Sequence, residues 1–206
     1  MNTIGAGAKR TLDLALSGAG LLLSSPLWIA VAIAISVESR GSVFFVQSRV
    51  GQRGRRFNAL KFRSMTVDAE RHVGPVQAVE HDPRVTRVGR VLRASALDEL
   101  PQLWNIFRGD MSVVGPRALR PDEPEVGEMT PTPLEDVPGF AERSSVRPGL
   151  TGLAQIYAPR DVRRRQKFRF DRLYIRRQSF GLDLYLIALS FWITARGTWE
   201  ARGPKF

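Results

Sequence analysis

Two adjacent carboxylates, Asp98 and Glu99, are the side chains best suited to chemistry in this sequence. Apolar residues follow them at helical spacing as far as Gly109, which predicts that the pair lies in the first turn of a helix. Pro101 fits such a turn because the N–H that it lacks would have no partner there. The partial positive charge of a helix N-terminus favours ionised carboxylates. In isolation, however, an acidic pair of this kind is usually a helix cap or a solvated charge.

The types of the surrounding residues suggest what the pair binds. Two ionised carboxylates side by side repel each other unless a cation lies between them, and oxygen ligands of this kind suit Mg²⁺. We therefore predict that Asp98 and Glu99 hold Mg²⁺. Arg93 and Arg117 lie on either side of them in the sequence. We expect these two arginines to bind the phosphates that such a metal bridges.

The segment around this pair resembles a known family signature. The sequence LRASALDELPQLWNIFRGDMSVVGPR, residues 92–117, is similar to that of the bacterial sugar transferases, monotopic phosphoglycosyl transferases that begin glycan assembly on a polyprenyl-phosphate carrier. The resemblance continues in order through residues 57–65, 147–156 and 167–175, so it covers nearly the whole chain. One position departs from the family pattern, which usually reads Gly-Pro-Arg-Pro. Here Ala118 follows the arginine, and the second proline that would make this turn rigid is missing.

The resemblance implies a reaction. Asp98 would attack the sugar-bearing β-phosphate of a UDP-sugar, release UMP and form a covalent phosphosugar intermediate. Polyprenyl phosphate would then accept the phosphosugar. Glu99 would be the main Mg²⁺ ligand, with Asp98 sharing the ion. Arg93, Arg117 and, less directly, Lys61 would contact phosphate or nucleotide.

Three further residues are candidates for substrate binding. Arg63 follows Lys61 by two positions in a predicted strand, so both side chains project from the same face, either toward phosphate or into solvent. Asp161 and Asp171 are isolated acids within the basic run of residues 160–177. Each is either the ion-pair partner of an arginine or a contact to the nucleotide.

Composition limits the alternatives. The chain has 206 residues, no cysteine and a formal net charge of +11. The lack of cysteine excludes disulfides, zinc-thiolate sites and cysteine nucleophiles. Such a basic domain suits nucleic acid, an anionic membrane surface or polyphosphate substrates.

Two other functions remain open from the residues alone. A membrane-tethered protein that binds nucleic acid or anionic lipid would explain the charge, but it would leave Asp98 and Glu99 without a task. A Mg²⁺-dependent phosphohydrolase would use the same residues, with water as the acceptor. We expect a UDP-sugar, polyprenyl phosphate and membrane lipids as partners, and no nucleic acid.

Residues 14–37 form an uncharged segment with a break at its centre. A straight helix of this length would measure ~36 Å and would cross a ~30 Å hydrocarbon core. Pro26, however, removes one backbone hydrogen bond and should bend the helix. The hydroxyls of Ser24 and Ser25 could satisfy the freed carbonyls.

Basic residues flank this segment on both sides, at positions 9–10 and from residue 40 onward. The positive-inside tendency therefore favours placing both ends on the cytoplasmic side. We predict a re-entrant hairpin, as the resemblance also implies, rather than a single span or a cleaved signal peptide. The expected location is the bacterial inner membrane, with the catalytic domain facing the cytoplasm.

The remaining segments complete an expected α+β fold that is mostly helical. Residues 42–50 and 56–65 predict a small β-hairpin. Residues 121–142, rich in proline and acidic side chains, predict an irregular loop with one short helical piece, which we take as a candidate cover for the active site. The basic run 160–177 and the apolar segment 184–195 predict two C-terminal helices.

The second of these helices is too short to span a membrane, so we expect both to lie at the membrane interface, with a buried core helix as the alternative. The predicted division is a membrane-anchoring helix at 1–39 and a catalytic domain at 40–206.

Overall fold

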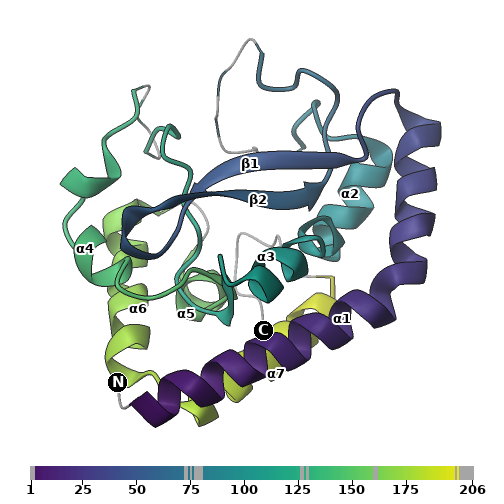
Figure 1. The fold of residues 1–206 in the computed structure, drawn as a ribbon. Helices are drawn as coiled ribbons and strands as arrows, with labels where there is room; N and C mark the ends of the chain where they lie inside the picture. The colour runs from purple at the N-terminus through teal and green to yellow at the C-terminus, as the bar shows by residue number, and fades with distance from the viewer. Residues whose placement is uncertain are drawn as a thin grey trace.

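The structure is a computed structural model that describes residues 3–71, 74, 76, 81–125, 128, 130–159, 162–197 and 199. Helices predominate, as Figure 1 shows. The described part of the chain also has two small two-stranded sheets. The predicted fold class, α+β with a long apolar helix at the N-terminus, is confirmed.

The helices are α1 (Thr3–Glu38), α2 (Arg87–Ala94), α3 (Gln102–Arg108), α4 (Phe140–Arg143), α5 (Leu153–Tyr157), α6 (Arg164–Arg177) and α7 (Phe180–Ala195). The strands are β1 (Phe44–Val50), β2 (Arg56–Phe62), β3 (Ser112–Val114) and β4 (Gly149–Thr151). Three short 3₁₀ turns are η1 (Gln52–Gly54), η2 (Leu97–Glu99) and η3 (Leu134–Asp136). The turn η3 and helix α4 are the only regular elements in the described part of the predicted loop 121–142.

The hairpin of β1 and β2 is antiparallel and confirms the sequence prediction. Its register places Phe44 opposite Phe62 and Phe45 opposite Lys61. The second strand ends at Phe62, three residues earlier than expected, so Arg63 lies just beyond it.

The second sheet, which the sequence did not predict, pairs β3 and β4 in parallel. It joins the Gly-Pro-Arg segment to the segment that begins at Arg147. The backbones meet closely here, because a Cβ atom added to Gly149 would lie 2.0 Å from the amide nitrogen of Gly115. Glycine is therefore required where the two segments cross.

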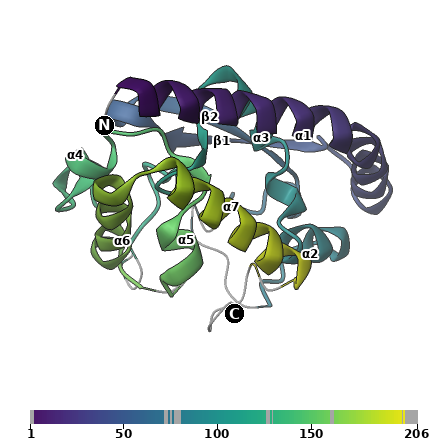
Figure 2. The same ribbon diagram turned by 90° about the horizontal axis from the view of Figure 1, so that it is seen from below.

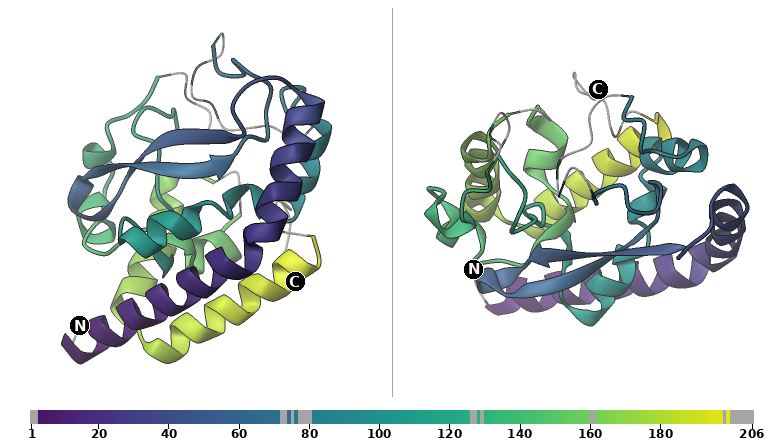
Figure 3. Two further views of the ribbon diagram at one scale, coloured as in Figure 1. Left: turned by 45° about the vertical axis from the view of Figure 1, so that its right-hand side comes forward. Right: turned by 90° about the horizontal axis from the view of Figure 1, so that it is seen from above.

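Helix α1 bends near Pro26, as Figures 1 and 3 show. The N–H that Pro26 lacks would have bonded the carbonyl of Leu22, four residues earlier. The hydroxyl of Ser25 donates to this same carbonyl at 2.8 Å. The indole of Trp28 donates to the hydroxyl of Ser24 at 2.9 Å. The predicted bend, and the role of a serine in satisfying the freed carbonyl, are confirmed.

Much of the apolar surface of α1 is uncovered by the rest of the fold. Among the described residues, the stretch Gly7–Glu38 is the one helix long and apolar enough to cross a membrane, and only 11% of an 18-residue apolar part of it is buried. Leu22 is 77% exposed and Leu23 is 83% exposed, on the turn next to the bend. Beyond the bend, Val31 and Ile35 are buried in a core cluster with residues of β2 and α2.

The C-terminal helices α6 and α7 occur where they were predicted. Figures 2 and 3 show α7 beside the first half of α1, and the two helices are in contact. Leu186 and Ile193 of α7 are fully buried, whereas Phe191 is 70% exposed and Trp192 is 45% exposed. Helix α7 therefore covers the core with one face and presents apolar and aromatic side chains with the other, as an interfacial helix requires.

Candidate active site

Asp98 and Glu99 lie in the 3₁₀ turn η2 rather than in the first turn of α3. The predicted helix therefore starts later than expected, at Gln102, with Pro101 as its N-cap. The reason is local: Ala96 adopts a left-handed conformation (φ 56°) that redirects the chain after α2, so a separate turn forms before α3. The predicted stop at Gly109 is correct, because this residue ends α3 at φ 96°.

The carboxylate of Glu99 is buried and held by two cations. Lys61 Nζ lies 2.6 Å from Glu99 Oε1, and Arg117 Nη2 lies 3.1 Å from the same oxygen. Burial alone would raise the pKa of Glu99. The positive charges of Lys61 and Arg117 outweigh that effect and hold the pKa well below its usual range. Glu99 is therefore an anion at neutral pH, and it fixes two cationic side chains on its own side of the site.

Arg49 adds a third positive charge to this cluster. Burial and the nearby charge of Arg117 lower the pKa of Arg49 to about 10, so it still carries its charge at neutral pH. Its guanidinium donates to the carbonyl of Ala118 at 2.8 Å. The turn after Arg117 is thus held by an arginine in this chain, without the second proline of the family pattern.

Asp171 is linked to Arg117 through Arg143. Its carboxylate pairs with Arg143 at 2.9 Å, and both side chains are almost completely buried. Burial raises the pKa of Asp171, and the charge of Arg143 opposes that rise. Arg143 also donates to the backbone carbonyl of Arg117 at 2.6 Å and lies over the ring of Phe168. Of the two roles predicted for Asp171, the ion pair with an arginine is present in the structure. Asp171 also lines the cavity of the site, and its contact with the nucleotide stays a prediction.

Arg63 points away from Glu99. Its guanidinium donates to the carbonyls of Ser39 at 2.8 Å and Arg40 at 2.6 Å, at the end of α1. Lys61 and Arg63 were predicted to share a role because they share a strand face. In the structure Lys61 binds the carboxylate of Glu99, whereas Arg63 binds the backbone carbonyls of the two residues that follow α1.

All the predicted site residues that the structure describes, Arg63 and Asp171 included, line one large cavity of about 1040 Å³. Asp98, Glu99, Lys61, Arg93 and Arg117 all line it. Asp98 and Arg93 are partly buried and come from η2 and α2, whereas Arg117 follows β3. Asp161 lies outside the described residues.

The donor set fits Mg²⁺ brought by a phosphate substrate. Among the residues that the structure describes, no group of three or more histidine, cysteine or acidic side chains could hold a metal ion by itself. Mg²⁺, however, commonly binds through one or two carboxylates together with substrate phosphates and water. Both ion pairs of Glu99 engage the same oxygen, Oε1, and Asp98 lines the same cavity.

Sequence reasoning missed three residues that shape the site. The sequence does not distinguish Arg49 and Arg143 from the many other arginines of this basic chain. Only the fold brings these two side chains close to Arg117. Gln102 is 4% exposed, and its amide nitrogen has no hydrogen-bond partner among the described residues. It lines a small recess together with Lys61, Glu99 and Arg117. In the sequence, the position of Gln102 next to Pro101 and three residues after Glu99 was the one indication that it belongs to the site.

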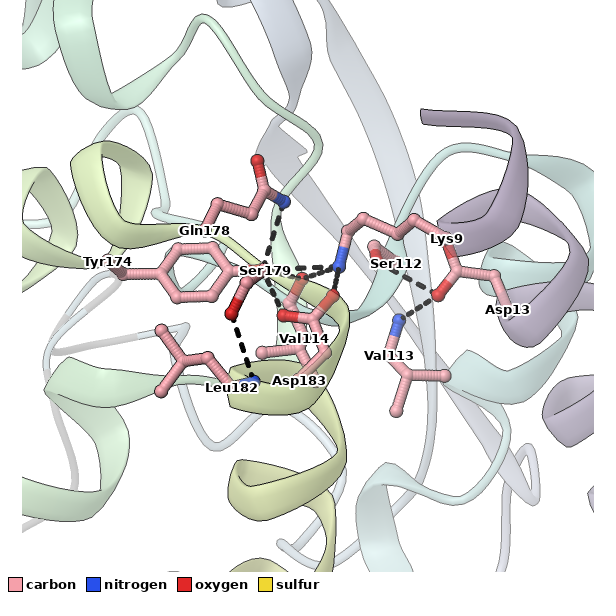
Figure 4. A network of polar contacts seen from close by, with 10 residues as sticks. All are labelled: Lys9, Asp13, Ser112, Val113, Val114, Tyr174, Gln178, Ser179, Leu182 and Asp183. Carbon is pink, nitrogen blue, oxygen red and sulfur yellow. Dashed lines mark hydrogen bonds and ion pairs between the residues drawn. The ribbon is translucent and has the colours of Figure 1, made fainter. Parts of the chain in front are cut away.

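A second buried polar network joins the start of α1 to the rest of the fold (Figure 4). Lys9 Nζ lies 2.7 Å from Asp183 Oδ2 of α7 and donates to the carbonyl of Val114 at 2.9 Å. The hydroxyl of Tyr174 donates to the other oxygen of Asp183 at 2.7 Å. One turn further along α1, Asp13 accepts from the hydroxyl of Ser112 at 2.9 Å.

The far end of α1 is attached to the same folded unit. The carboxylate of Glu38 accepts from the backbone N–H groups of Arg87 at 2.6 Å and Val88 at 2.9 Å, at the start of α2. Both ends of the apolar helix are therefore bonded to the domain that carries Asp98.

Comparisons with known proteins agree with the geometry. The bacterial sugar transferase family matches residues 4–197. The undecaprenyl-phosphate glucose phosphotransferase of Komagataeibacter xylinus is 42% identical over 189 residues, which cover 88% of this chain and 35% of that protein. The exopolysaccharide production protein ExoY of Rhizobium meliloti (strain 1021) is 39% identical over 198 residues, covering 89% of this chain and 84% of that protein.

A third relative, the UDP-glucose:undecaprenyl-phosphate glucose-1-phosphate transferase of Klebsiella pneumoniae, is 40% identical over 195 residues. These cover 92% of this chain and 40% of that protein. The chain thus spans less than half the length of the Komagataeibacter and Klebsiella proteins and most of the Rhizobium protein. It belongs to the bacterial sugar transferase family.

Proposed function

We propose that this chain transfers a sugar phosphate from a UDP-sugar to polyprenyl phosphate and releases UMP. The observation that carries the proposal is the buried Glu99 carboxylate, fixed by Lys61 and Arg117 next to Asp98 in a large basic cavity. Such a site places positive charge where the phosphates of a nucleotide-sugar must lie. Relatives named for undecaprenyl-phosphate sugar transfer support the same reaction.

In the proposed first step, a carboxylate oxygen of Asp98 attacks the β-phosphorus of the UDP-sugar. The bond from that phosphorus to the bridging oxygen breaks, and UMP leaves with the electron pair. In the second step, a phosphate oxygen of polyprenyl phosphate attacks the same phosphorus and releases the carboxylate. The product is a polyprenyl diphosphate-linked sugar, and no external oxidant or proton source is required.

The other residues have supporting roles in this proposal. Arg117 and Arg93 bind phosphoryl oxygens, while Lys61 keeps Glu99 ionised and oriented. Mg²⁺, bound through Glu99 and Asp98, would neutralise phosphoryl charge as it shifts toward the leaving UMP. We expect excess EDTA to abolish transfer, and full activity in EDTA would show that the arginines act without a metal.

The reaction is tested by measuring UMP release from a panel of UDP-sugars, with and without polyprenyl phosphate. We expect sustained UMP release only when the lipid is present, together with an intact mass increased by one sugar phosphate when it is absent. Sustained release without lipid would indicate a phosphohydrolase. Binding of vesicles or nucleic acid without any release would indicate a binding protein. The identity of the active donor would name the sugar.

We also propose that α1 enters and leaves the same side of the bacterial inner membrane, with the catalytic domain on the cytoplasmic face. Three observations support a re-entrant helix: the bend at Pro26, basic residues at both flanks, and bonds from both ends of α1 to one folded unit. A straight helix of this length would separate its ends by ~54 Å and break one set of these bonds.

The topology is tested with a Thr3→Cys variant, since the native chain has no competing cysteine. We expect a membrane-impermeant thiol reagent to reach this cysteine only from the cytoplasmic side. Replacing Pro26 and Ser25 together, by leucine and alanine, should straighten α1 and move the label site toward the opposite side. Labelling of the Thr3→Cys protein from the opposite side without those replacements would mean that α1 spans the membrane.

A further inference from the structure

The cavity beside Glu99 has two chemically different arms. Toward α6 it is lined by charged side chains that include Arg143, Arg164 and Lys167. Toward the end of α1 it is lined by large apolar side chains from β1 and from the segment that follows β2, together with the charged side chains of Arg63, Asp68, Glu70 and Arg71. The apolar arm consists of Phe44, Phe45, Met65, Val67 and Val76.

The side chains of the apolar arm remain in contact with water. Phe44 and Phe45 are each 39% exposed, Val67 is 55% exposed and Val76 is 36% exposed. Apolar surface that is gathered in a cavity and left uncovered is typical of a site for an apolar ligand. The charged side chains of this arm are engaged within the protein. Glu70 binds Arg120 at 2.7 Å, Asp68 lies 3.6 Å from Arg71, and Arg63 donates to the backbone just after α1.

The apolar arm is continuous with the charged centre. Phe45 lies directly opposite Lys61 in the hairpin register, so the two side chains project from the same face. Lys61 in turn binds Glu99. A ligand that covers Phe45 therefore has one end beside the cluster of Lys61, Glu99 and Arg117.

The apolar arm also begins where α1 meets the hairpin. The ring of Phe44 packs 5.9 Å from the ring of Trp28 of α1. Val67 lies against the turn after α1, since a Cβ atom added to Gly41 would come within 2.9 Å of its Cγ2 atom. The arm thus connects the membrane helix to the phosphate-binding centre.

Resting on the proposed function, we propose that the apolar arm binds the phosphate-proximal isoprene units of the polyprenyl acceptor. Its phosphate then lies at Lys61 and Arg117, while the charged arm toward α6 is left for the nucleotide. A molecule that is anionic at one end and hydrocarbon beyond it matches the order of side chains along this face. A nucleotide, which is polar throughout, does not.

Two variants and a matched control test the acceptor arm. Phe45→Gln and Val67→Gln place a polar group in the arm, whereas Val46→Gln changes a neighbouring exposed residue of β1 that does not line the cavity. We expect the first two variants to raise the KM for polyprenyl phosphate about tenfold, because each loses apolar contact with the lipid. Exchange of labelled UMP into the UDP-sugar without lipid should stay unchanged, and Val46→Gln should alter neither measurement.

A fall in UMP exchange that parallels the loss of lipid transfer would overturn the inference, because the arm would then serve the donor. An unchanged KM for the lipid would overturn it as well.

A second measurement does not depend on turnover. A polyprenyl phosphate that carries a diazirine on its first isoprene unit should label residues 42–45 and 64–68 of the unsubstituted protein. Label on α6 instead would contradict the assignment. Failure of the proposed function would appear separately, as absence of transfer by the unsubstituted protein.

Discussion

The cluster around Glu99 and the network around Asp183 both bury charged side chains, but they balance charge differently. In the network of α1 and α7, the ammonium of Lys9 meets the carboxylate of Asp183, whose second oxygen accepts from Tyr174. The nearby carboxylate of Asp13 accepts from Ser112. Around Glu99, the charges of Lys61, Arg117 and Arg49 all act on one buried carboxylate.

A balanced buried pair fixes the position of two elements and requires no ligand. The cations around Glu99 also face the carboxylates of Asp98 and Glu123, and they line a large cavity where an anionic substrate can meet them. The difference separates a structural network from a substrate site within one chain, although both consist of the same residue types.

The largest expected effect is that of Asp98→Asn, which keeps the size of the side chain and removes the nucleophile. We expect sugar-phosphate transfer to fall by more than about a hundredfold, equivalent to about 2.7 kcal/mol of transition-state stabilisation. The melting temperature should stay close to that of the unsubstituted protein. A variant that retains more than about a hundredth of the transfer rate would contradict the assignment of Asp98.

Glu99→Gln should reduce both activity and stability, because it leaves Lys61 buried without its anionic partner. Breaking a buried pair of this kind costs about 3 kcal/mol. Adding Lys61→Met to Glu99→Gln removes the stranded charge, so the free energy of unfolding should recover while transfer stays lost. Recovery of transfer in the double variant would show that the pair serves only the fold.

Asp183→Asn should lower the stability of the fold more than it lowers sugar-phosphate transfer. It strands Lys9 and weakens the attachment of α1, so we expect a loss of stability of about 3 kcal/mol with a smaller loss of transfer per folded molecule. The double variant Lys9→Met, Asp183→Asn is the matched control and should regain most of the stability. A loss of transfer as deep as that of Asp98→Asn would mean that the two networks are not separate.

The smallest effect concerns the dependence of stability on pH. The folded pKa of Glu99 lies below its ordinary value of 4.5, so its ionised form stabilises the fold above that pH. This contribution is lost as the pH falls from 4.5 toward the folded pKa. The difference in melting temperature between the unsubstituted protein and Glu99→Gln should therefore narrow in acid. If the difference in melting temperature stays constant between neutral pH and a pH of about 3, the ionised Glu99 does not stabilise the fold through its ion pairs.

Local patterns in the sequence were sufficient for several features. Pro26 dictates the bend of α1 because it lacks an N–H, and the neighbouring Ser25 supplies the replacement bond. The hairpin and the stop of α3 at Gly109 likewise depend on residues close together in the chain. Asp98 and Glu99 were identified as the candidate catalytic residues by their residue types, by their spacing and by the resemblance of their segment to a family signature.

The partners of that pair were decided only by tertiary structure. The sequence does not distinguish Lys61, which binds Glu99, from Arg63 two residues later, which binds the end of α1. Nor does it indicate that Arg143 and Asp171 support Arg117, since a basic chain offers many equivalent arginines. Hydrogen-bond geometry along the backbone is local, and the sequence therefore determines it directly. Pairing of buried charges depends on which distant elements pack together, and only the fold fixes that choice.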